Sequence, residues 1–96
     1  MNFIFHPDAV IELDDAVAYY EEIETGLGID LAAEVYSAVQ RACTMPGGWT
    51  TMTGDVRRSL VKRFPYGVLY SHEDGFIFII AVMHLHRDPE YWKDRV

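Results

Sequence analysis

One uninterrupted apolar stretch, Phe76 to Met83, constrains the fold of this chain more than any other segment. A strand with one face in solvent alternates apolar and polar residues, whereas this stretch is apolar on both faces. We therefore expect a central strand that is covered on both sides. The preceding Glu73-Asp74-Gly75 offers an Asp-Gly turn of the kind that closes a tight β-hairpin. Even when it is extended to Leu85, the stretch is too short to span a membrane as a helix.

Two helices are predicted before this strand. Pro7 suits a first helical turn because it needs no N–H partner there, and Asp8 favours the positive end of the helix dipole. The apolar stripe of this helix consists of Val10, Leu13, Val17, Tyr20 and then Ile23 or Glu24, with Glu12, Asp14, Asp15, Glu21 and Glu22 facing away. Gly26 is suited to a left-handed cap that ends the helix. A second helix, from Asp30 to Met45, has a stripe of Leu31, Ala32, Val35, Ala38, Val39 and Ala42.

The remaining strands are predicted at residues 2 to 6, Val56 to Arg63 and Phe64 to His72, with a loop at residues 46 to 55. Glu90 to Val96 form either one or two helical turns or an ordered tail. Neither a hairpin nor a helix pair is stable alone, so we expect one α+β domain with the element order β-α-α-β-β-β. In it, an antiparallel helix hairpin packs on a four-stranded sheet.

Charge is distributed unevenly along the 96 residues, whose net charge is −7. Residues 1 to 50 hold nine acidic residues and one basic residue, whereas residues 51 to 96 hold six acidic and seven basic residues. Positive potential can therefore gather only on the second half. The single cysteine, Cys43, cannot form an internal disulfide, and no basic leader precedes an apolar run at the N-terminus. Both features predict a cytoplasmic protein without a signal peptide.

The pair His84-x-His86 is the first candidate for chemistry. Alternation along a strand would put both imidazoles on one face, a spacing that can bind zinc or copper. A third ligand would have to come from His6, His72 or Asp88. Because such pairs are frequent by chance, two strand-end histidines that make local hydrogen bonds are the favoured interpretation, and no metal site is predicted.

Nucleophilic and acid–base catalysis find little support. Ser37, Ser59 and Ser71 lack a flanking glycine elbow, and Cys43 reads as a packed helix residue. The acidic pairs of the first helix form no recognisable catalytic dyad, and a solvated surface explains them better.

Cations and aromatic residues interleave in the second half of the chain. The cations are Arg57, Arg58, Lys62, Arg63, Arg87, Lys93 and Arg95, and the aromatic residues are Tyr66, Tyr70, Tyr91 and Trp92. We expect Arg63 to lie in one region of the sheet with His84, His86 and Arg87. This combination is typical of a single-stranded RNA site and of a protein-docking hot spot. The alternative interpretation is that these residues only keep the strand edges soluble.

Three stretches resemble the RelE/ParE family of bacterial type II toxins, also called plasmid-stabilisation proteins. They read FHPDAVIELDDAVAYYEE, RRSLVKRFPYGVLY and AVMHLHRDPEYWKDR, and the resemblance runs from Phe3 to Arg95. RFPYGVLY and HLHRDPEYW are its most specific parts. The resemblance implies a helix hairpin against a curved, mainly antiparallel sheet. It also implies a cognate antitoxin that wraps and neutralises the toxin.

The family contains two activities. RelE-type members cut messenger RNA in the ribosome with cations on the sheet and a C-terminal tyrosine, for which Tyr91 is the matching candidate. Gly67 occupies the position of one catalytic arginine of the RelE-type members, and the position of a second falls near Leu85 or Arg87. ParE-type members block DNA gyrase without chemistry of their own. The absent arginine at Gly67, the acidic net charge and the Arg-Phe-Pro-Tyr sequence favour the ParE-like branch.

The sequence therefore predicts a ParE-like, non-enzymatic toxin without a cofactor, with a cognate antitoxin and DNA gyrase as partners and no membrane association. The predicted target-binding residues are Arg58, Lys62, Arg63, His84, His86, Arg87, Tyr91 and Trp92. The alternative is a ribosome-dependent mRNA endonuclease, with His84 or His86 as general acid or base, Arg63 and Arg87 on the phosphate, and Tyr91 assisting. A third possibility is a non-toxic remnant that only binds an antitoxin.

Overall fold

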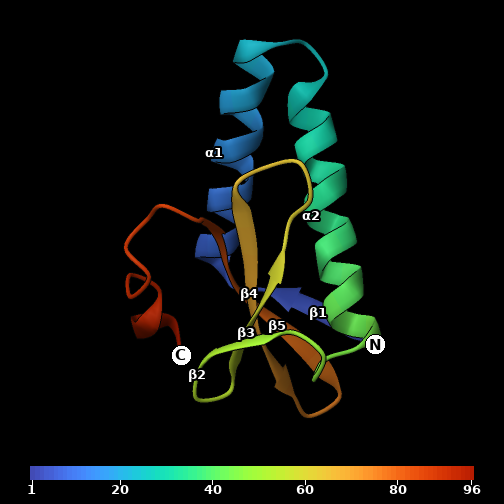
Figure 1. Ribbon diagram of the computed structural model, residues 1–96, viewed down its shortest axis with the longest axis vertical. Helices are drawn as coiled ribbons and strands as arrows, with labels where there is room; N and C mark the ends of the chain where they lie inside the picture. The colour runs from blue at the N-terminus through green and yellow to red at the C-terminus, as the bar shows by residue number, and fades with distance from the viewer.

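The computed structural model describes residues 1–96, which form a helix hairpin on one face of a five-stranded sheet (Figure 1). The elements in chain order are β1 (Asn2–Phe5), α1 (Pro7–Ile23), α2 (Leu27–Thr44), β2 (Thr50–Thr53), β3 (Val56–Leu60), β4 (Tyr66–Glu73), β5 (Phe76–His84) and the 3-10 turn η1 (Lys93–Arg95). The order of strands across the sheet is β1-β5-β4-β3-β2. Only β1 and β5 run parallel, so the sheet is mainly antiparallel, as predicted. Neither helix is long and apolar enough to cross a bilayer.

The strand β5 lies between β1 and β4 and is buried from both sides. Ile77 and Ile79 join the core beneath the helices, whereas Ile80 and Met83 join a second apolar cluster on the opposite face. The expectation of a central strand with cover on both faces is thus confirmed. The turn at Asp74 and Gly75 closes a two-residue hairpin between β4 and β5, in which Gly75 has a φ of +85°.

The sheet has five strands rather than the four predicted. Thr50–Thr53, assigned to a loop from the sequence, pairs with β3 as an edge strand. The four residues Thr-Thr-Met-Thr carry no apolar alternation, so the sequence lacked the usual strand signal. Backbone pairing with β3 nevertheless orders them, as β-branched threonine allows.

The strands predicted at Val56 to Arg63 and Phe64 to His72 are not contiguous, because a loop separates them. The strand β3 ends at Leu60, and β4 begins only at Tyr66. Val61 donates its N–H to the carbonyl of Tyr66, which closes the loop, and Pro65 has no N–H for a sheet ladder. Arg63 adopts a φ of +71° within this loop.

Helix α1 is rotated relative to the predicted apolar stripe. Leu13 is buried as expected, but Val10 and Ile23 are 42% and 59% exposed. Ala9 and Ala16 face the core instead, because small side chains let the helix approach the sheet closely. The rotation turns Glu12 inward, although the sequence predicted it in solvent.

The junction between the helices also differs from the prediction. Gly26 has the expected positive φ, at +92°, but it precedes α2 rather than ending α1. Helix α2 therefore begins at Leu27, not at Asp30. The Glu21 side chain accepts the backbone N–H groups of Gly26 and Gly28, which satisfies donors that a helix start leaves unpaired.

Helix α2 packs on the sheet through its predicted stripe, of which all but the half-buried Ala32 is buried. Ser59 of β3 donates its hydroxyl to the Ala38 carbonyl at 2.9 Å, and the Tyr70 hydroxyl donates to the Pro46 carbonyl at 2.6 Å. These two bonds tie the C-terminal half of α2 to β3, and the loop just after the helix to β4. They fix one flank of the sheet.

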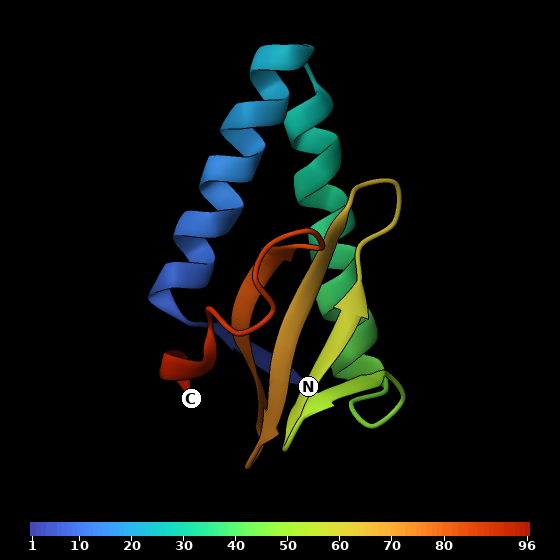
Figure 2. The same ribbon diagram turned by 60° about the vertical axis from the view of Figure 1, so that its left-hand side comes forward.

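The residues after β5 form an ordered tail against the sheet face that the helices leave open (Figure 2). Trp92 is 1% exposed and packs with Val56, Leu69, Ile80 and Met83. The short turn η1 follows it. The tail predicted as either helical turns or ordered chain is thus both, since a single 3-10 turn ends an ordered segment.

Candidate functional site

The predicted target-binding residues lie in four separate places. His84, His86, Arg87 and Tyr91 gather where β5 passes into the tail, near Glu12 of α1. Arg58 and Lys62 line a cavity at the flank of the sheet, and Arg63 points to α2. Trp92 is buried within the protein, so its indole is not available at the surface while the tail is docked.

Glu12 is the centre of a group that we call the tail ion cluster, made of Glu12, Arg87, Tyr91 and Arg95. The Glu12 side chain is 12% exposed. Its carboxylate accepts two N–H groups of Arg95 at 3.0 and 3.1 Å, and also the backbone N–H of Val82 at 3.0 Å. Arg87 approaches the same carboxylate at 3.8 Å. Asp8 also lies 3.8 Å from Nε of Arg95, so the two carboxylates together balance the two arginines, and Glu12 joins α1, β5 and the tail.

Tyr91 lies against both guanidinium groups of this cluster. The carbon atom of the Arg87 guanidinium is 3.7 Å from the centre of the Tyr91 ring, and that of Arg95 is 5.1 Å away. Burial, together with the adjacent Glu12 carboxylate, raises the pKa of Tyr91 well above its ordinary value. The phenol therefore keeps its proton at neutral pH and does not act as a base.

The two histidines do not share a strand face, contrary to the prediction. Strand β5 ends at His84, and His86 belongs to the following turn. The backbone N–H of His86 donates to Nδ1 of His84 at 3.1 Å, and the two rings meet edge to face at 5.3 Å. This is the local hydrogen bonding that the sequence favoured. No group of three or more His, Cys, Asp or Glu side chains is placed to hold a metal ion.

A small cleft of about 220 Å³ opens beside the tail ion cluster. His84 and Arg87 line it from the end of β5, and Tyr66 closes it from β4 with its ring 5.1 Å from that of His84. Glu12, Asp15, Ala16, Tyr19 and Val82 complete the lining. The carboxylates of Glu12 and Asp15 outnumber the one cation in this wall, Arg87, which makes the cleft a poor site for phosphate.

Arg63 is not part of that group, although the sequence predicted that they would share one region. Its guanidinium lies 3.5 Å from Asp30 and 4.0 Å from Glu34, both on α2. The loop between β3 and β4 turns the side chain toward the acidic helix. These contacts are largely exposed, so they position Arg63 more than they stabilise the fold.

Gly67 makes room for Arg58 of the neighbouring strand. A Cβ atom built at Gly67 would lie 2.9 Å from both Cγ and Cδ of Arg58. No side chain fits there without displacing the arginine. The position at which the family arginine is missing is therefore covered by another arginine, and the buried Nε of Arg58 has no hydrogen-bond partner.

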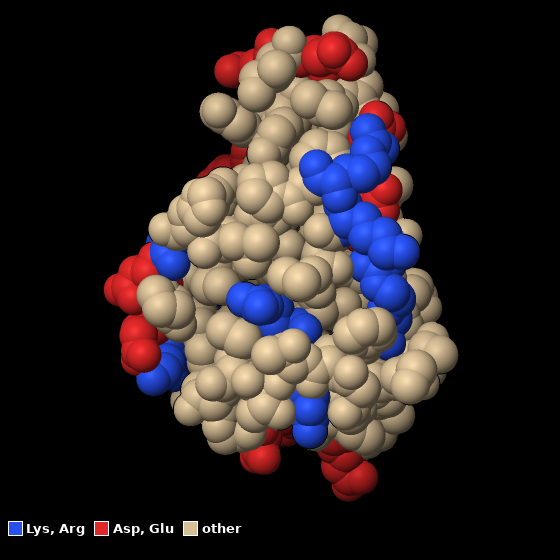
Figure 3. Space-filling view, viewed as in Figure 1, with Lys and Arg blue, Asp and Glu red and all other residues tan.

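Arg58 also lines a cavity of about 290 Å³ that we call the flank cavity. It is lined by Arg41, Trp49, Thr50, Arg58, Leu60 and Lys62. None of its three cations forms a salt bridge, whereas Arg63, Arg87, Lys93 and Arg95 all do. Figure 3 shows Lys and Arg side chains in a stripe along one side of the molecule. Sequence reasoning missed Arg41 and Trp49, because α2 and the following loop reach this flank only through the fold.

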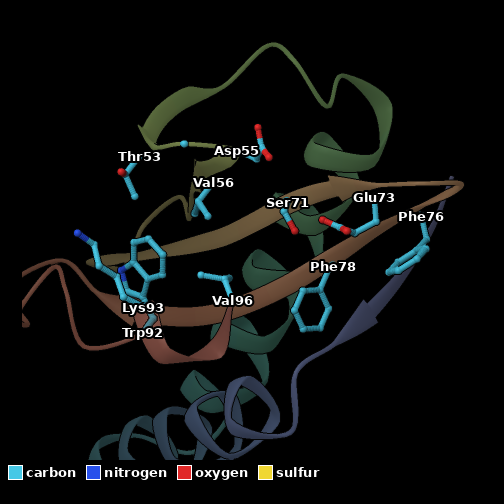
Figure 4. A pocket seen from close by; sticks show the side chains of 11 residues that line it. Thr53, Asp55, Val56, Ser71, Glu73, Phe76, Phe78, Trp92, Lys93 and Val96 are labelled. Atoms are coloured by element: carbon cyan, nitrogen blue, oxygen red, sulfur yellow. The ribbon is translucent and has the colours of Figure 1, made fainter.

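The largest cavity, of about 710 Å³, is a groove between the tail, the β2–β3 turn and the outer face of β5 (Figure 4). Phe76 and Phe78 of β5, Val56 of β3, and Trp92 and Val96 of the tail provide its apolar surface. The sequence offered one signal for it, since the first two outward positions of β5, Phe76 and Phe78, are aromatic. The groove and the flank cavity are separate, with no lining residue in common.

The elements and their arrangement define an α+β class in which an antiparallel helix hairpin covers one face of a mixed sheet. The chain is similar in structure to a chain of the chromosomal ParDE TA (toxin–antitoxin) system from P. aeruginosa, with a TM-score of 0.78 and 16% sequence identity. The match covers 90% of this chain and 97% of that chain. It confirms the predicted fold. No family model matches the sequence, and no curated protein matches it either.

Proposed function

We propose that this chain is the ParE-like toxin of a type II toxin–antitoxin pair. It acts in the cytoplasm, arrests growth by binding DNA gyrase, and is neutralised by a cognate antitoxin. The observation that carries the proposal is the fold shared with a ParDE chain over 90% of the length. The residue pattern from His84 to Trp92, noted in the sequence, supports the same family.

The tail ion cluster supports binding rather than catalysis. Arg87 and Arg95, which would have to stabilise a transferred phosphoryl group, already share the Glu12 carboxylate. Tyr91 is held in its neutral form. A cation that is already neutralised contributes little to the charge of a transition state. The exposed His86 and Arg87 are the proposed contacts with the target, with His84 beside them.

One observation favours the enzymatic alternative, a ribosome-dependent mRNA endonuclease. Arg58 covers the place of the absent family arginine, and its guanidinium has no acidic partner. The lack of an arginine at position 67 is therefore weaker evidence against RNA cleavage than the sequence alone indicated. The acidic surface of the rest of the chain still opposes binding to ribosomal RNA.

Expression in bacteria, followed by assays with purified components, tests the proposal. We expect growth arrest on expression and inhibition of gyrase supercoiling by the purified chain, with ribosome-bound messages left intact. Uninhibited supercoiling together with cut messages would establish the endonuclease instead. Normal growth despite soluble expression would point to the non-toxic remnant that only binds an antitoxin.

A pair of variants tests the proposed contact surface. The double variant His86→Ala/Arg87→Ala removes two exposed side chains, and we expect it to weaken gyrase inhibition at least about tenfold. Lys93→Ala is the matched control, because Lys93 is an exposed tail cation paired only with Glu90. Equal inhibition by both variants would exclude this surface.

A further inference from the structure

The flank cavity concentrates unpaired positive charge in an acidic protein. Of the eight Lys and Arg residues in a chain of net charge −7, Arg41, Arg58 and Lys62 all line one cavity without a carboxylate partner. Like charges in one place repel one another, so such a cluster is unfavourable to the folded chain alone. An anionic ligand removes this repulsion.

Two of these cations are held in position. Arg41 donates an Nη2 hydrogen to the carbonyl of Leu60 at 2.9 Å, which directs its guanidinium across the cavity wall. The Arg58 side chain is confined over Gly67, and its Nε is buried without any acceptor. Because Nε is shielded from solvent, an anion in the cavity would pair with the charge of the guanidinium group rather than with this donor.

Trp49 adds a planar aromatic surface to the same cavity. Its indole Nε1 donates to the backbone carbonyl of Arg41 at 3.0 Å, and its own carbonyl accepts a bond of 2.7 Å from Arg57. Both ends of the residue are therefore fixed before a ligand arrives. Thr50, on the open edge strand, also lines the cavity. Cations next to a stackable ring are the groups that bind a phosphate with an attached base.

We propose that the flank cavity binds the phosphate of a nucleotide, with Trp49 against the base. Its volume of about 290 Å³ matches the low end of small-molecule sites, about 300 to 1,000 Å³, and suits one nucleotide. The acidic surface elsewhere disfavours a long nucleic-acid strand. An acidic protein segment would satisfy the cations but would leave the indole without a matching planar group. The site goes beyond the proposed toxin function and does not depend on it.

Nuclear magnetic resonance of the ¹⁵N-labelled full chain provides a direct test. The chain has only two tryptophans, so it gives two indole N–H signals, from Trp49 in the cavity and from Trp92, which the tail packs against the sheet. We expect ADP to shift the Trp49 signal and to leave the Trp92 signal in place. Inorganic pyrophosphate, which has no base, should compete with ADP for the site.

Lys62→Gln is the test variant, because Lys62 is exposed and forms no ion pair, so its loss leaves the fold intact. We expect ADP affinity to fall about tenfold, as for one lost charge-assisted contact. Lys93→Gln, an exposed lysine on the tail, should leave the affinity unchanged. Equal affinity in Lys62→Gln and wild type would overturn the proposal.

The source of the phosphate is decided by comparing ADP with a 5′-phosphorylated dinucleotide. Tighter binding of ADP identifies a free nucleotide, and tighter binding of the dinucleotide identifies the end of a strand; both outcomes support a nucleotide site. Polyglutamate represents the alternative ligand, an acidic protein segment. If polyglutamate shifts Trp49 more strongly than ADP, or if ADP shifts neither indole, the nucleotide proposal is wrong.

Discussion

The tail ion cluster and the flank cavity both combine cations with an aromatic residue, but the cations are paired with a carboxylate only in the tail ion cluster. In the first, Arg87 and Arg95 share the inward carboxylate of Glu12, and their aromatic neighbour Tyr91 is partly buried. In the second, three cations surround a cavity beside Trp49 and have no acidic partner. A carboxylate close to the guanidinium group therefore decides whether an arginine stabilises the fold or remains free to bind a ligand.

The largest effect is expected from Glu12→Ala. This change leaves Arg95 and the backbone N–H of Val82 without their shared acceptor in a site that is only 10 to 12% exposed. Loss of one partner of a buried pair costs about 3 kcal/mol. Urea denaturation should show that loss, whereas Asp14→Ala on the exposed side of α1 should change the free energy of unfolding by less than about 0.5 kcal/mol. Similar values for the two variants would refute the central role of Glu12.

An intermediate effect is expected from Gly67→Ala. The added Cβ would meet Cγ and Cδ of Arg58 at 2.9 Å, so the arginine has to move or the strands have to separate. Overpacking of this kind costs about 1 to 2 kcal/mol. In the double variant Gly67→Ala/Arg58→Ala, the collision is gone, and we expect most of the lost stability to return. Additive losses in that double-mutant cycle would show that Arg58 does not occupy the space above Gly67.

The smallest effect at neutral pH is expected from Tyr91→Phe, since the phenol has no hydrogen-bond partner there. Its raised pKa favours the neutral phenol in the folded state. The stabilisation is therefore fully present below the ordinary pKa of 10.0 and is lost as the pH rises above it. Unfolding measured between about pH 9 and 11 should be less pH-dependent in Tyr91→Phe than in wild type. Burial also raises the pKa values of Tyr66, Tyr70 and Cys43, and these three groups contribute to the slope that remains. An unchanged slope in the variant would show that Tyr91 ionises as freely in the folded chain as in the unfolded one.

Local patterns in the sequence predicted most of the fold. The apolar run of β5 required cover on both faces, and the stripe of α2 identified the residues that pack on the sheet. Pro7 and Gly75 marked a helix start and a tight turn where the structure has them. These features depend on residues close together in the chain, whose backbone preferences and periodicity can be read directly.

The sites depended on contacts that only the tertiary structure decided. Glu12 and Arg95 are 83 residues apart, and the inward rotation of α1 that joins them follows from packing rather than periodicity. Arg41 and Lys62 face one cavity because Ser59 and Tyr70 anchor α2 to the sheet. Sequence by itself determined both helices and four of the five strands, and it showed that seven of the eight Lys and Arg residues lie in the second half of the chain. Which cations are neutralised and which remain free was settled by side-chain directions across the sheet, because an ion pair requires a distance that no linear pattern specifies.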